Sequence, residues 1–261
     1  MINNQRQREI IEIISEKGNV TVDELSERFN VSKMTIRRDL EKLQDENYLQ
    51  RTHGGALVNK VLLQEMAYHE KREEHLNAKT CIARKALDFI EANSTVYLDA
   101  GTTTFEIAKI LPQSDLTVIT NDIRIAAHLM LTRNTVYFLG GNIMKETGST
   151  TDPHAQKMLE AFNIDLSILA TSGVDKDLNL CTPELNRMLI KQTAIRQSEK
   201  KILVADASKF YRKSLYKIVP LQSFDAIITD LDKEELGNVD LKKAKLFTLY
   251  CPIDTKESSH A

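Results

Sequence analysis

Small polar residues gather at four places in this chain, each directly after a short apolar segment. The groups are Asp99, Gly101, Thr102, Thr103 and Thr104, then Thr120 and Asn121, then Gly140 and Gly141, and last Asp206, Ser208 and Lys209. Where a helix begins after such a group, its free N–H groups and the positive end of its dipole stabilise a phosphate. Glycine lets the main chain approach a ligand, and lysine adds a positive charge. The chemistry that these residues could do is therefore anion binding.

Catalysis is the alternative use of the same residues. One such group is as well explained by an ordinary turn and helix cap, but four at successive strand ends favour a pocket. Isomerisation would need a general base, and Asp99, Glu184 and Asp206 are the candidates. Their spacing is not typical of a catalytic pair, and the glycine patterns of P-loops, dinucleotide-binding folds and hydrolase elbows are absent. We therefore predict a binding protein and no enzyme, with an isomerase-like enzyme as the alternative.

Short apolar segments alternate with helical ones from residue 77 onward. We predict strands at 95–98, 116–119, 136–139, 166–170, 202–205, 226–228 and 246–249, and helices at 81–90, 105–111, 123–131, 153–162 and 185–196. This alternation is typical of an α/β domain with a doubly wound, mostly parallel sheet and helices on both faces. Ligands of such sheets bind beyond the carboxyl ends of the strands, which is where the four polar groups lie.

The segment 21–55 carries a second set of signals, for two short helices and a hairpin. Thr21 and Glu24 have the spacing of a capping box, and Ser32 is a further N-cap, so a second helix over about 33–44 follows the first closely. Two helices joined so tightly indicate a helix-turn-helix. The pair Gly54–Gly55 permits the positive φ of a tight hairpin turn. Together these features predict a small N-terminal winged helix-turn-helix domain.

Such a domain reads DNA with the second helix and the hairpin. We predict that the following residues bind DNA: Ser32, Lys33, Met34, Thr35, Arg37, Arg38, Lys42, Arg51, His53 and Gly54. Arginine can pair with guanine, whereas lysine and threonine more often contact phosphate. The alternative is an ordinary solvated basic face. It is less favoured here because the two caps, the turn and the hairpin occur together.

The charge balance of the chain indicates that more than one copy binds double-stranded operator DNA. The chain has a net charge of −2, and residues 1–60 contain ten basic and ten acidic residues. Affinity for DNA rises with the number of phosphates neutralised, so one copy should bind weakly. We therefore expect a homo-oligomer, a dimer or tetramer, that reads half-sites about one helical turn apart.

The composition of the chain indicates the cellular compartment in which the protein works. The chain has 261 residues, no apolar run long enough to span a membrane and no signal-peptide core at its start. Its three cysteines, Cys81, Cys181 and Cys251, are far apart, which favours a reducing compartment and argues against a structural metal. We expect a cytoplasmic protein without cofactor or metal.

The residues 32–40 (SKMTIRRDL) and 51–56 (RTHGGA) resemble the N-terminal signature of the DeoR family of bacterial transcription regulators. The resemblance implies a C-terminal sensor domain similar to sugar-phosphate isomerases, and a repressor of sugar or polyol catabolism that a phosphorylated metabolite releases from its operator. The four polar groups match the family's sensor motif, and the match adds Lys191 as a ligand residue. The implied domains are 1–58 for DNA binding, 59–76 as a helical connector, 77–255 for sensing and 256–261 as a disordered tail.

Three positions depart from the family's pattern. Asp152 and Asn179 lie where glycine is usual, and Arg187 lies where an acidic residue usually precedes Lys191 by about four positions. A carboxylate at Asp152 would repel a phosphate, so these changes bear on the identity of the ligand. A further alternative is a constitutive DNA-binding protein whose C-terminal domain only oligomerises.

Overall fold

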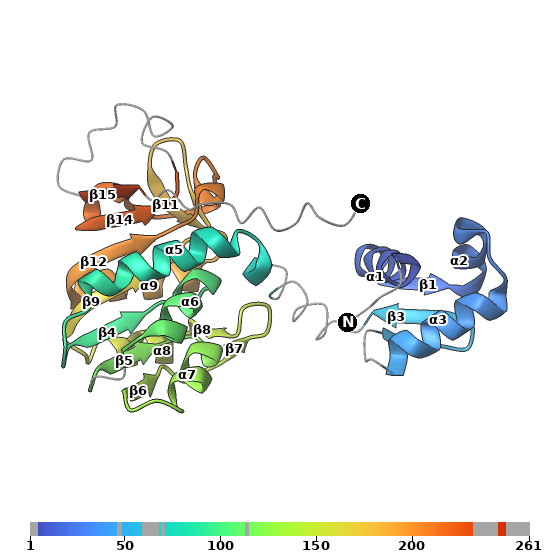
Figure 1. Cartoon of the computed structure of the whole chain (residues 1–261), viewed down its shortest axis with the longest axis horizontal. Helices are drawn as coiled ribbons and strands as arrows, with labels where there is room; N and C mark the ends of the chain where they lie inside the picture. Colours follow the sequence, from blue (N-terminus) through green and yellow to red (C-terminus); the bar gives the residue numbers. More distant parts are fainter. Residues whose placement is uncertain are drawn as a thin grey trace. The chain divides into compact units, whose positions relative to one another are not determined.

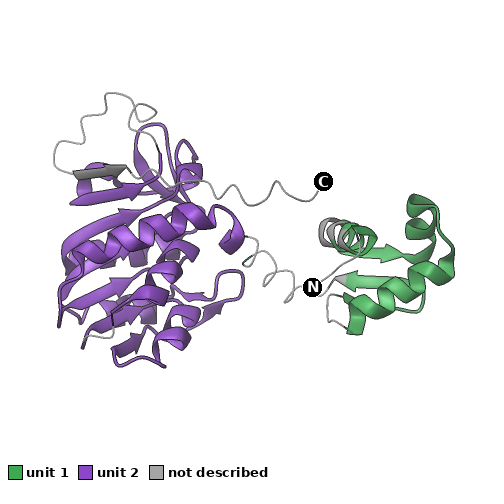
Figure 2. Cartoon of the chain, viewed as in Figure 1, with its two compact units in different colours: residues 1–70 green, residues 71–261 purple. Residues whose placement is uncertain are grey.

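The computed structural model describes residues 5–45, 49–58, 68, 71–112, 115–231 and 245–248. The chain divides into two compact units, Met1–Glu70 and Lys71–Ala261, which we call unit 1 and unit 2 (Figure 2). The predicted tail 256–261 and most of the predicted connector 59–76 lie outside the described residues. None of the helices in the described ranges is long and apolar enough to cross a membrane.

Unit 1 packs three helices against a small antiparallel sheet (Figure 1). The elements are α1 (Gln5–Lys17), β1 (Asn19–Thr21), α2 (Val22–Phe29), α3 (Lys33–Asp45), β2 (Leu49–Arg51) and β3 (Gly55–Val58), with strand order β1-β3-β2. The predicted capping box is confirmed, because the Glu24 N–H donates to Thr21 Oγ1 at 3.1 Å and the Thr21 N–H donates to Glu24 Oε2 at 2.9 Å. The apolar stripe of α3 is buried against Ile10 and Ile14 of α1.

The hairpin turn differs from the prediction. Neither Gly54 nor Gly55 adopts a positive φ, so the expectation that this pair supplies a left-handed turn is wrong. Gly55 is needed for a different reason, because it pairs with Thr21 of β1 and a Cβ there would lie 1.9 Å from the Val20 carbonyl oxygen. The third strand, β1, brings this close approach about, and the sequence analysis did not predict it.

Unit 2 is built on a seven-stranded sheet in which all neighbouring strands are parallel. Its order is β15-β14-β12-β9-β4-β5-β6, from β4 (Thr95–Leu98), β5 (Thr117–Thr120), β6 (Thr135–Phe138), β9 (Ile164–Leu169), β12 (Ser198–Val204), β14 (Ala226–Thr229) and β15 (Lys245–Thr248). The predicted strands correspond to these within a few residues. The prediction of a parallel α/β sheet is thereby confirmed.

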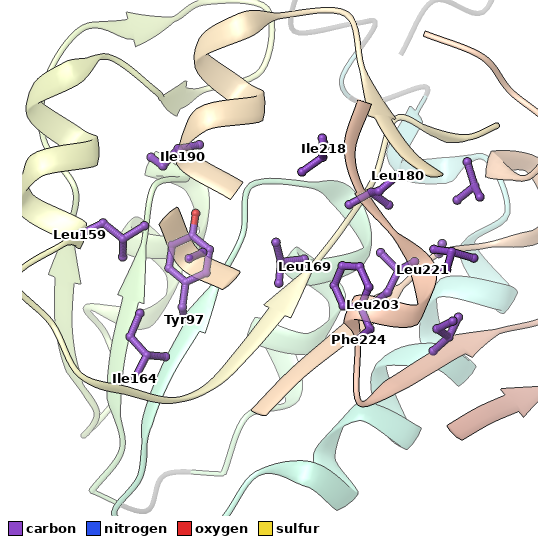
Figure 3. Close-up of a cluster of buried hydrophobic side chains, with 14 of the residues drawn as sticks. Tyr97, Leu159, Ile164, Leu169, Leu180, Ile190, Leu203, Ile218, Leu221 and Phe224 are labelled. Carbon is purple, nitrogen blue, oxygen red and sulfur yellow. The ribbon is translucent and has the colours of Figure 1, made fainter. Parts of the chain in front are cut away.

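Helices cover both faces of this sheet, as a doubly wound fold requires. On one face, α5 (Leu76–Ala86), α6 (Thr102–Ile110) and α7 (Ile123–Leu129) pack against side chains such as Val96 and Ile168. On the other face, α8 (Pro153–Leu159) and α9 (Leu185–Gln197) pack around Tyr97, Leu169 and Leu203 (Figure 3). Alternate residues of one strand thus point into two different cores, as in Val96 and Tyr97.

Several smaller elements of unit 2 were not predicted. The hairpin of β7 (Ile143–Met144) and β8 (Ser149–Thr150) follows β6, and a second sheet joins β10 (Gly173–Val174), β11 (Asn179–Thr182) and β13 (Tyr216–Pro220). Three short 3-10 helices, η1 (Leu87–Phe89), η2 (Ala207–Lys209) and η3 (Leu221–Ser223), complete the unit. The helix predicted at 105–111 begins earlier, at Thr102. Its three threonines are weak helix formers that the first turn nevertheless accepts.

Candidate DNA-binding face and ligand site

The helix α3 presents the predicted DNA-binding residues to solvent. The side chains of Lys33, Arg37, Arg38 and Lys42 are exposed, and Met34 is 58% exposed. Ser32 caps the helix, since the Thr35 N–H donates to Ser32 Oγ at 3.2 Å. The cap orients the first turn, whose residues approach base edges when such a helix enters the major groove.

Two acidic residues pair with cations of this face. Lys33 Nζ lies 2.8 Å from Asp23 Oδ1 of α2, and both side chains are exposed. Arg51 Nη1 lies 2.6 Å from Glu41 Oε1 of α3. The Arg51 N–H also donates to Gln44 Oε1 at 3.0 Å, so β2 is tied to α3. Surface pairs of this kind contribute little stability, and a DNA phosphate competes with them readily.

A hollow of about 290 Å³ lies between α2, α3 and the hairpin. Its lining comprises residues 21–23, Arg37 and residues 51–55. It therefore brings Arg37 of the helix together with Arg51, His53 and Gly54 of the hairpin, as a winged helix-turn-helix requires.

Asp39 of α3 is a buried charged residue to which no role was assigned from the sequence. Its buried carboxylate accepts from Arg6 Nε at 2.7 Å and from Gln7 Nε2 at 2.9 Å, both on α1. The burial of Asp39 could have been predicted from the sequence, because Asp39 lies three residues after Ile36, on the same side of the helix as the apolar stripe. These two hydrogen bonds hold α3 against α1.

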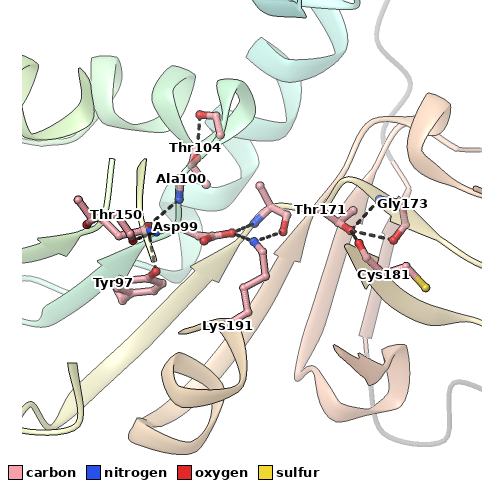
Figure 4. A network of polar contacts seen from close by, with 12 residues as sticks. Tyr97, Asp99, Ala100, Thr104, Thr150, Thr171, Gly173, Cys181 and Lys191 are labelled. Carbon is pink, nitrogen blue, oxygen red and sulfur yellow. Dashed lines mark hydrogen bonds and ion pairs between the residues drawn. The ribbon is translucent and has the colours of Figure 1, made fainter. Parts of the chain in front are cut away.

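The predicted ligand residues Asp99 and Lys191 form a buried ion pair at the carboxyl end of β4 (Figure 4). Asp99 is 1% and Lys191 3% exposed. The Ala170 N–H donates to Asp99 Oδ2 at 3.0 Å, and Lys191 Nζ donates to the Ala170 carbonyl at 2.9 Å. Burial lowers the pKa of Lys191, and the charge of Asp99 opposes that shift. Asp99 is therefore held as a partner of Lys191 and is poorly placed to act as a general base.

Three further predicted residues are engaged within the protein. Asn121 Oδ1 accepts from the Tyr97 hydroxyl and the Ala100 N–H, each at 3.0 Å, and its amide nitrogen donates to the Thr150 carbonyl (Figure 4). Thr104 Oγ1 donates to the Gly101 carbonyl at 2.9 Å, and Thr120 Oγ1 accepts from the Asp122 N–H at 3.1 Å. These side chains shape the loops after β4 and β5.

Within the part of the chain that the structure describes, backbone N–H groups at the start of α6 have no hydrogen-bond acceptor. Gly101 is the N-cap and no side chain caps the helix; the first helical bond runs from the Phe105 N–H to the Gly101 carbonyl. The N–H groups of Thr102, Thr103 and Thr104 therefore have no acceptor within the helix. Gly101 and Thr102 are half-buried, so an anion could reach this turn.

Asp122 lies beside this turn and was not among the predicted site residues. It is fully buried and caps α7, with Oδ1 accepting from the N–H groups of Arg124 and Ile125 at 2.8 and 3.3 Å. Burial raises its pKa from 3.8 to about 6, although those two N–H groups and that of Gly101 favour the ionised form. Its second oxygen, Oδ2, is buried and has no hydrogen bond within the described part of the chain.

The fourth polar group lies after β12, two strands away from β4. Asp206 Oδ1 accepts from the Ser208 N–H at 3.1 Å, and Lys209 Nζ lies 3.8 Å from Asp206 Oδ2. Asp206 also acts on a residue to which we had given no role, the buried Lys79 of α5. Burial lowers the pKa of Lys79, and the charge of Asp206 is the strongest opposing influence.

Lys79 forms hydrogen bonds to residues 71–74, the segment at the start of unit 2. Its Nζ donates to the carbonyls of Lys71, Arg72 and Glu74, with Glu74 at 2.6 Å. Arg72 is held a second time, because its Nε lies 3.5 Å from Glu106 Oε1 and its guanidinium lies over the Phe105 ring at 5.1 Å. Both contacts tie this segment to α6, whose first turn carries the unused donors.

Asp152 has a different role from the one expected. It is the N-cap of α8, and its carboxylate accepts from the N–H groups of Asn142, His154 and Ala155. The Asn142 N–H contributes most to lowering the pKa of Asp152. Gly141, with φ 119°, makes room for this carboxylate, because a Cβ there would lie 2.3 Å from Asp152 Oδ2. Its negative charge is thus compensated by a helix N-terminus.

The other two departures also have partners within unit 2. The side-chain amide of Asn179, in β11, donates to the Asp175 carboxylate. Arg187 reaches the β7–β8 hairpin, where its Nη2 lies 3.4 Å from Thr147 Oγ1. Within the described ranges, no three acidic, histidine or cysteine side chains are grouped so as to hold a metal ion.

A winged helix-turn-helix and a separate α/β unit with polar loops at its strand ends define the class of two-domain transcriptional regulators. Comparison with known proteins agrees: residues 6–61 match the model of the DeoR-like helix-turn-helix domain, and residues 74–231 match that of the DeoR C-terminal sensor domain. The chain belongs to the DeoR family.

Its relatives are named as regulators. It is 34% identical to the HTH-type transcriptional regulator GlpR of Haloferax volcanii, over 88% of this chain and 91% of that one. It is 32% identical to the glycerol-3-phosphate regulon repressor of Escherichia coli, over 87% and 90%. It is 33% identical to the L-fucose operon activator of Haemophilus influenzae, over 87% and 92%. These relatives confirm that the chain is a DNA-binding regulator and not an enzyme.

Proposed function

We propose that this chain represses a sugar or polyol catabolism operon and that a phosphorylated sugar-type metabolite, bound by unit 2, releases it from operator DNA. The uncapped first turn of α6 carries the proposal. Its free N–H groups lie at the carboxyl end of β4, beside the Asp99–Lys191 pair, where parallel α/β sheets bind ligands. The name of the Escherichia coli relative, a repressor of a glycerol-3-phosphate regulon, supports this class of effector.

On the DNA side, we infer that the exposed face of α3 reads base edges while the hairpin contacts the sugar-phosphate backbone. Exposure of Arg37 and Arg38 supports direct contact, and the hollow that joins Arg37 to His53 supports joint action of helix and hairpin. The balanced charge of residues 1–60 favours a homo-oligomer that binds paired half-sites in the cytoplasm.

We infer that Lys79 transmits ligand binding toward unit 1. Lys79 interacts through its charge with Asp206, in the loop after β12. Its Nζ also donates to the carbonyls of residues 71, 72 and 74. An anion that binds Lys209 offsets the positive charge that Lys209 exerts on Lys79, so that the charge of Asp206 acts on Lys79 with less opposition, and this changes how Lys79 holds residues 71–74. Linkage then requires that operator DNA weaken effector binding by the same factor.

The test uses the full chain and the promoter DNA next to its own gene. Thermal shift against phosphorylated sugars and polyols identifies binders, and fluorescence anisotropy measures whether they release DNA. We expect Thr102→Val and Lys209→Ala to abolish release without loss of DNA binding. Release of DNA from both variants at the wild-type effector concentration would refute the placement of the ligand.

Activation is a second candidate, because one relative is named an operon activator. A reporter gene behind the same promoter separates the two. Repression predicts higher expression when the gene for this chain is deleted, and activation predicts lower expression. A constitutive regulator, by contrast, would show no thermal shift with any metabolite.

A further inference from the structure

Two basic residues, Arg187 and Lys191, lie on the same side of α9. Arg187 precedes Lys191 by four residues, one helical turn. Lys191 is neutralised by its contact with Asp99. Burial is the main cause that lowers the pKa of Lys191, and the positive charge of Arg187 adds to it, so the two side chains lie within electrostatic reach.

Arg187 is not neutralised in the same way. Its side chain is 18% exposed, and its ion pair is with Glu184 Oε1, at 3.7 Å, on a side chain that is 39% exposed. Its hydrogen bond to Thr147 Oγ1, at 3.4 Å, is long. A guanidinium offers five N–H donors. Among the described residues, these contacts leave most of that capacity unused, and a loose pair with a half-exposed partner is readily exchanged.

The residue that Arg187 reaches, Thr147, lies in the turn between β7 and β8. Thr147 is also contacted by Arg124, whose Nη1 donates to the Thr147 carbonyl at 2.9 Å. The strand that follows, β8, bonds to the loop after β5, since the Thr150 N–H donates to the Asn121 carbonyl at 2.9 Å. The β7–β8 hairpin thus links Arg187 to the loop that carries Asn121.

The three residues directly before Arg187, namely Glu184, Leu185 and Asn186, line one side of a cavity of about 470 Å³, a size that suits a small metabolite. Asn142, Met144 and Thr151 line another side of this cavity. Amide and hydroxyl groups in this lining suit the hydroxyls of a polyol chain. Asp152 also lines the cavity, but its carboxylate is occupied by three N–H groups.

We propose that Arg187 selects effectors with a carboxylate at the end of the carbon chain opposite the phosphate, so that the effector is a phosphorylated sugar acid. The carboxylate replaces Glu184 as the partner of the guanidinium, which binds carboxylates through two parallel hydrogen bonds. Glu184, already half-exposed, turns to solvent. This inference rests on the proposed function and specifies its class of ligand.

The test compares compounds that differ only at that end. The pairs are glycerol 3-phosphate and 3-phosphoglycerate, erythritol 4-phosphate and 4-phosphoerythronate, and glucitol 6-phosphate and 6-phosphogluconate. Calorimetric titration of the full chain should show, in at least one pair, that the acid binds about tenfold more tightly, as expected for a charge-assisted pair. Arg187→Gln should reduce that ratio to about one, and Arg187→Lys should keep part of it.

Arg196→Gln is the matched control, because Arg196 lies on the same helix, is exposed and bonds to Thr193 of its own turn. It should leave the ratio unchanged. Binding of the alcohols as tightly as the acids, with a ratio that Arg187→Gln does not alter, overturns this inference and leaves the proposed function standing. Absence of binding by all six compounds overturns the inference and counts against the proposed function.

Discussion

The buried carboxylate of Asp122 makes a testable contribution to stability. Its pKa rises from an ordinary value of 3.8 to about 6 because the side chain is buried. At about 1.4 kcal/mol for each pH unit, this difference corresponds to about 3 kcal/mol. The folded state holds the proton more tightly, so the contribution is fully present below pH 3.8 and is lost as the pH rises through about 6.

Replacing Asp122 by Asn separates charge from capping. Asn is as good an N-cap as Asp, and its amide oxygen can still accept from the Arg124 and Ile125 N–H groups. The variant removes the buried charge, so we expect unit 2 to gain about 1–2 kcal/mol at pH 7.5, less than the full 3 kcal/mol because the cap bonds to a charged oxygen are stronger.

The assay is urea denaturation of both proteins at pH 4.5 and pH 7.5, monitored by circular dichroism. The comparison between wild type and variant cancels the titration of all other groups. We expect the variant to be more stable than the wild type at pH 7.5 and to lose that advantage at pH 4.5. A variant that is less stable at pH 7.5, with the same midpoint difference at both values, would refute the reasoning.

Three further changes are informative. Arg38→Ala should weaken binding to a specific operator by ~1–3 kcal/mol if Arg38 pairs with a base, measured by anisotropy; unchanged affinity would exclude that contact. Asp39→Ala should destabilise unit 1 by ~1–3 kcal/mol, measured by thermal unfolding, because the buried amide of Gln7 loses the carboxylate that accepts from it. Lys79→Met should keep DNA binding and effector binding but bring their coupling, normally five- to 150-fold, close to one, and hydrogen exchange at residues 71–76 should rise. The control Lys85→Met, on the same helix, should do neither.

Local chemistry made much of this chain predictable. The capping box of Thr21 and Glu24, the Ser32 cap and the alternation of apolar segments act over a few residues, so their effect on helices and strands is visible in order along the chain. The parallel sheet and the position of the polar loops follow from that alternation. Helix ends were less predictable, as α6 shows, because threonine is tolerated in a first turn.

The partners of buried charges could not be predicted, since nothing in local spacing specifies them. Asp99 and Lys191 are 92 residues apart, yet folding excludes water from both and leaves each as the other's counter-charge. Asp39, Lys79 and Asp122 acquired their roles in the same way, from burial against distant segments. Gly55 is required because β1 passes beside it, not because its own turn needs it. Short-range hydrogen bonds and apolar periodicity can be predicted from the order of residues along the chain. The desolvation of buried charges and the close approach of β1 to Gly55 arise only once the chain has folded.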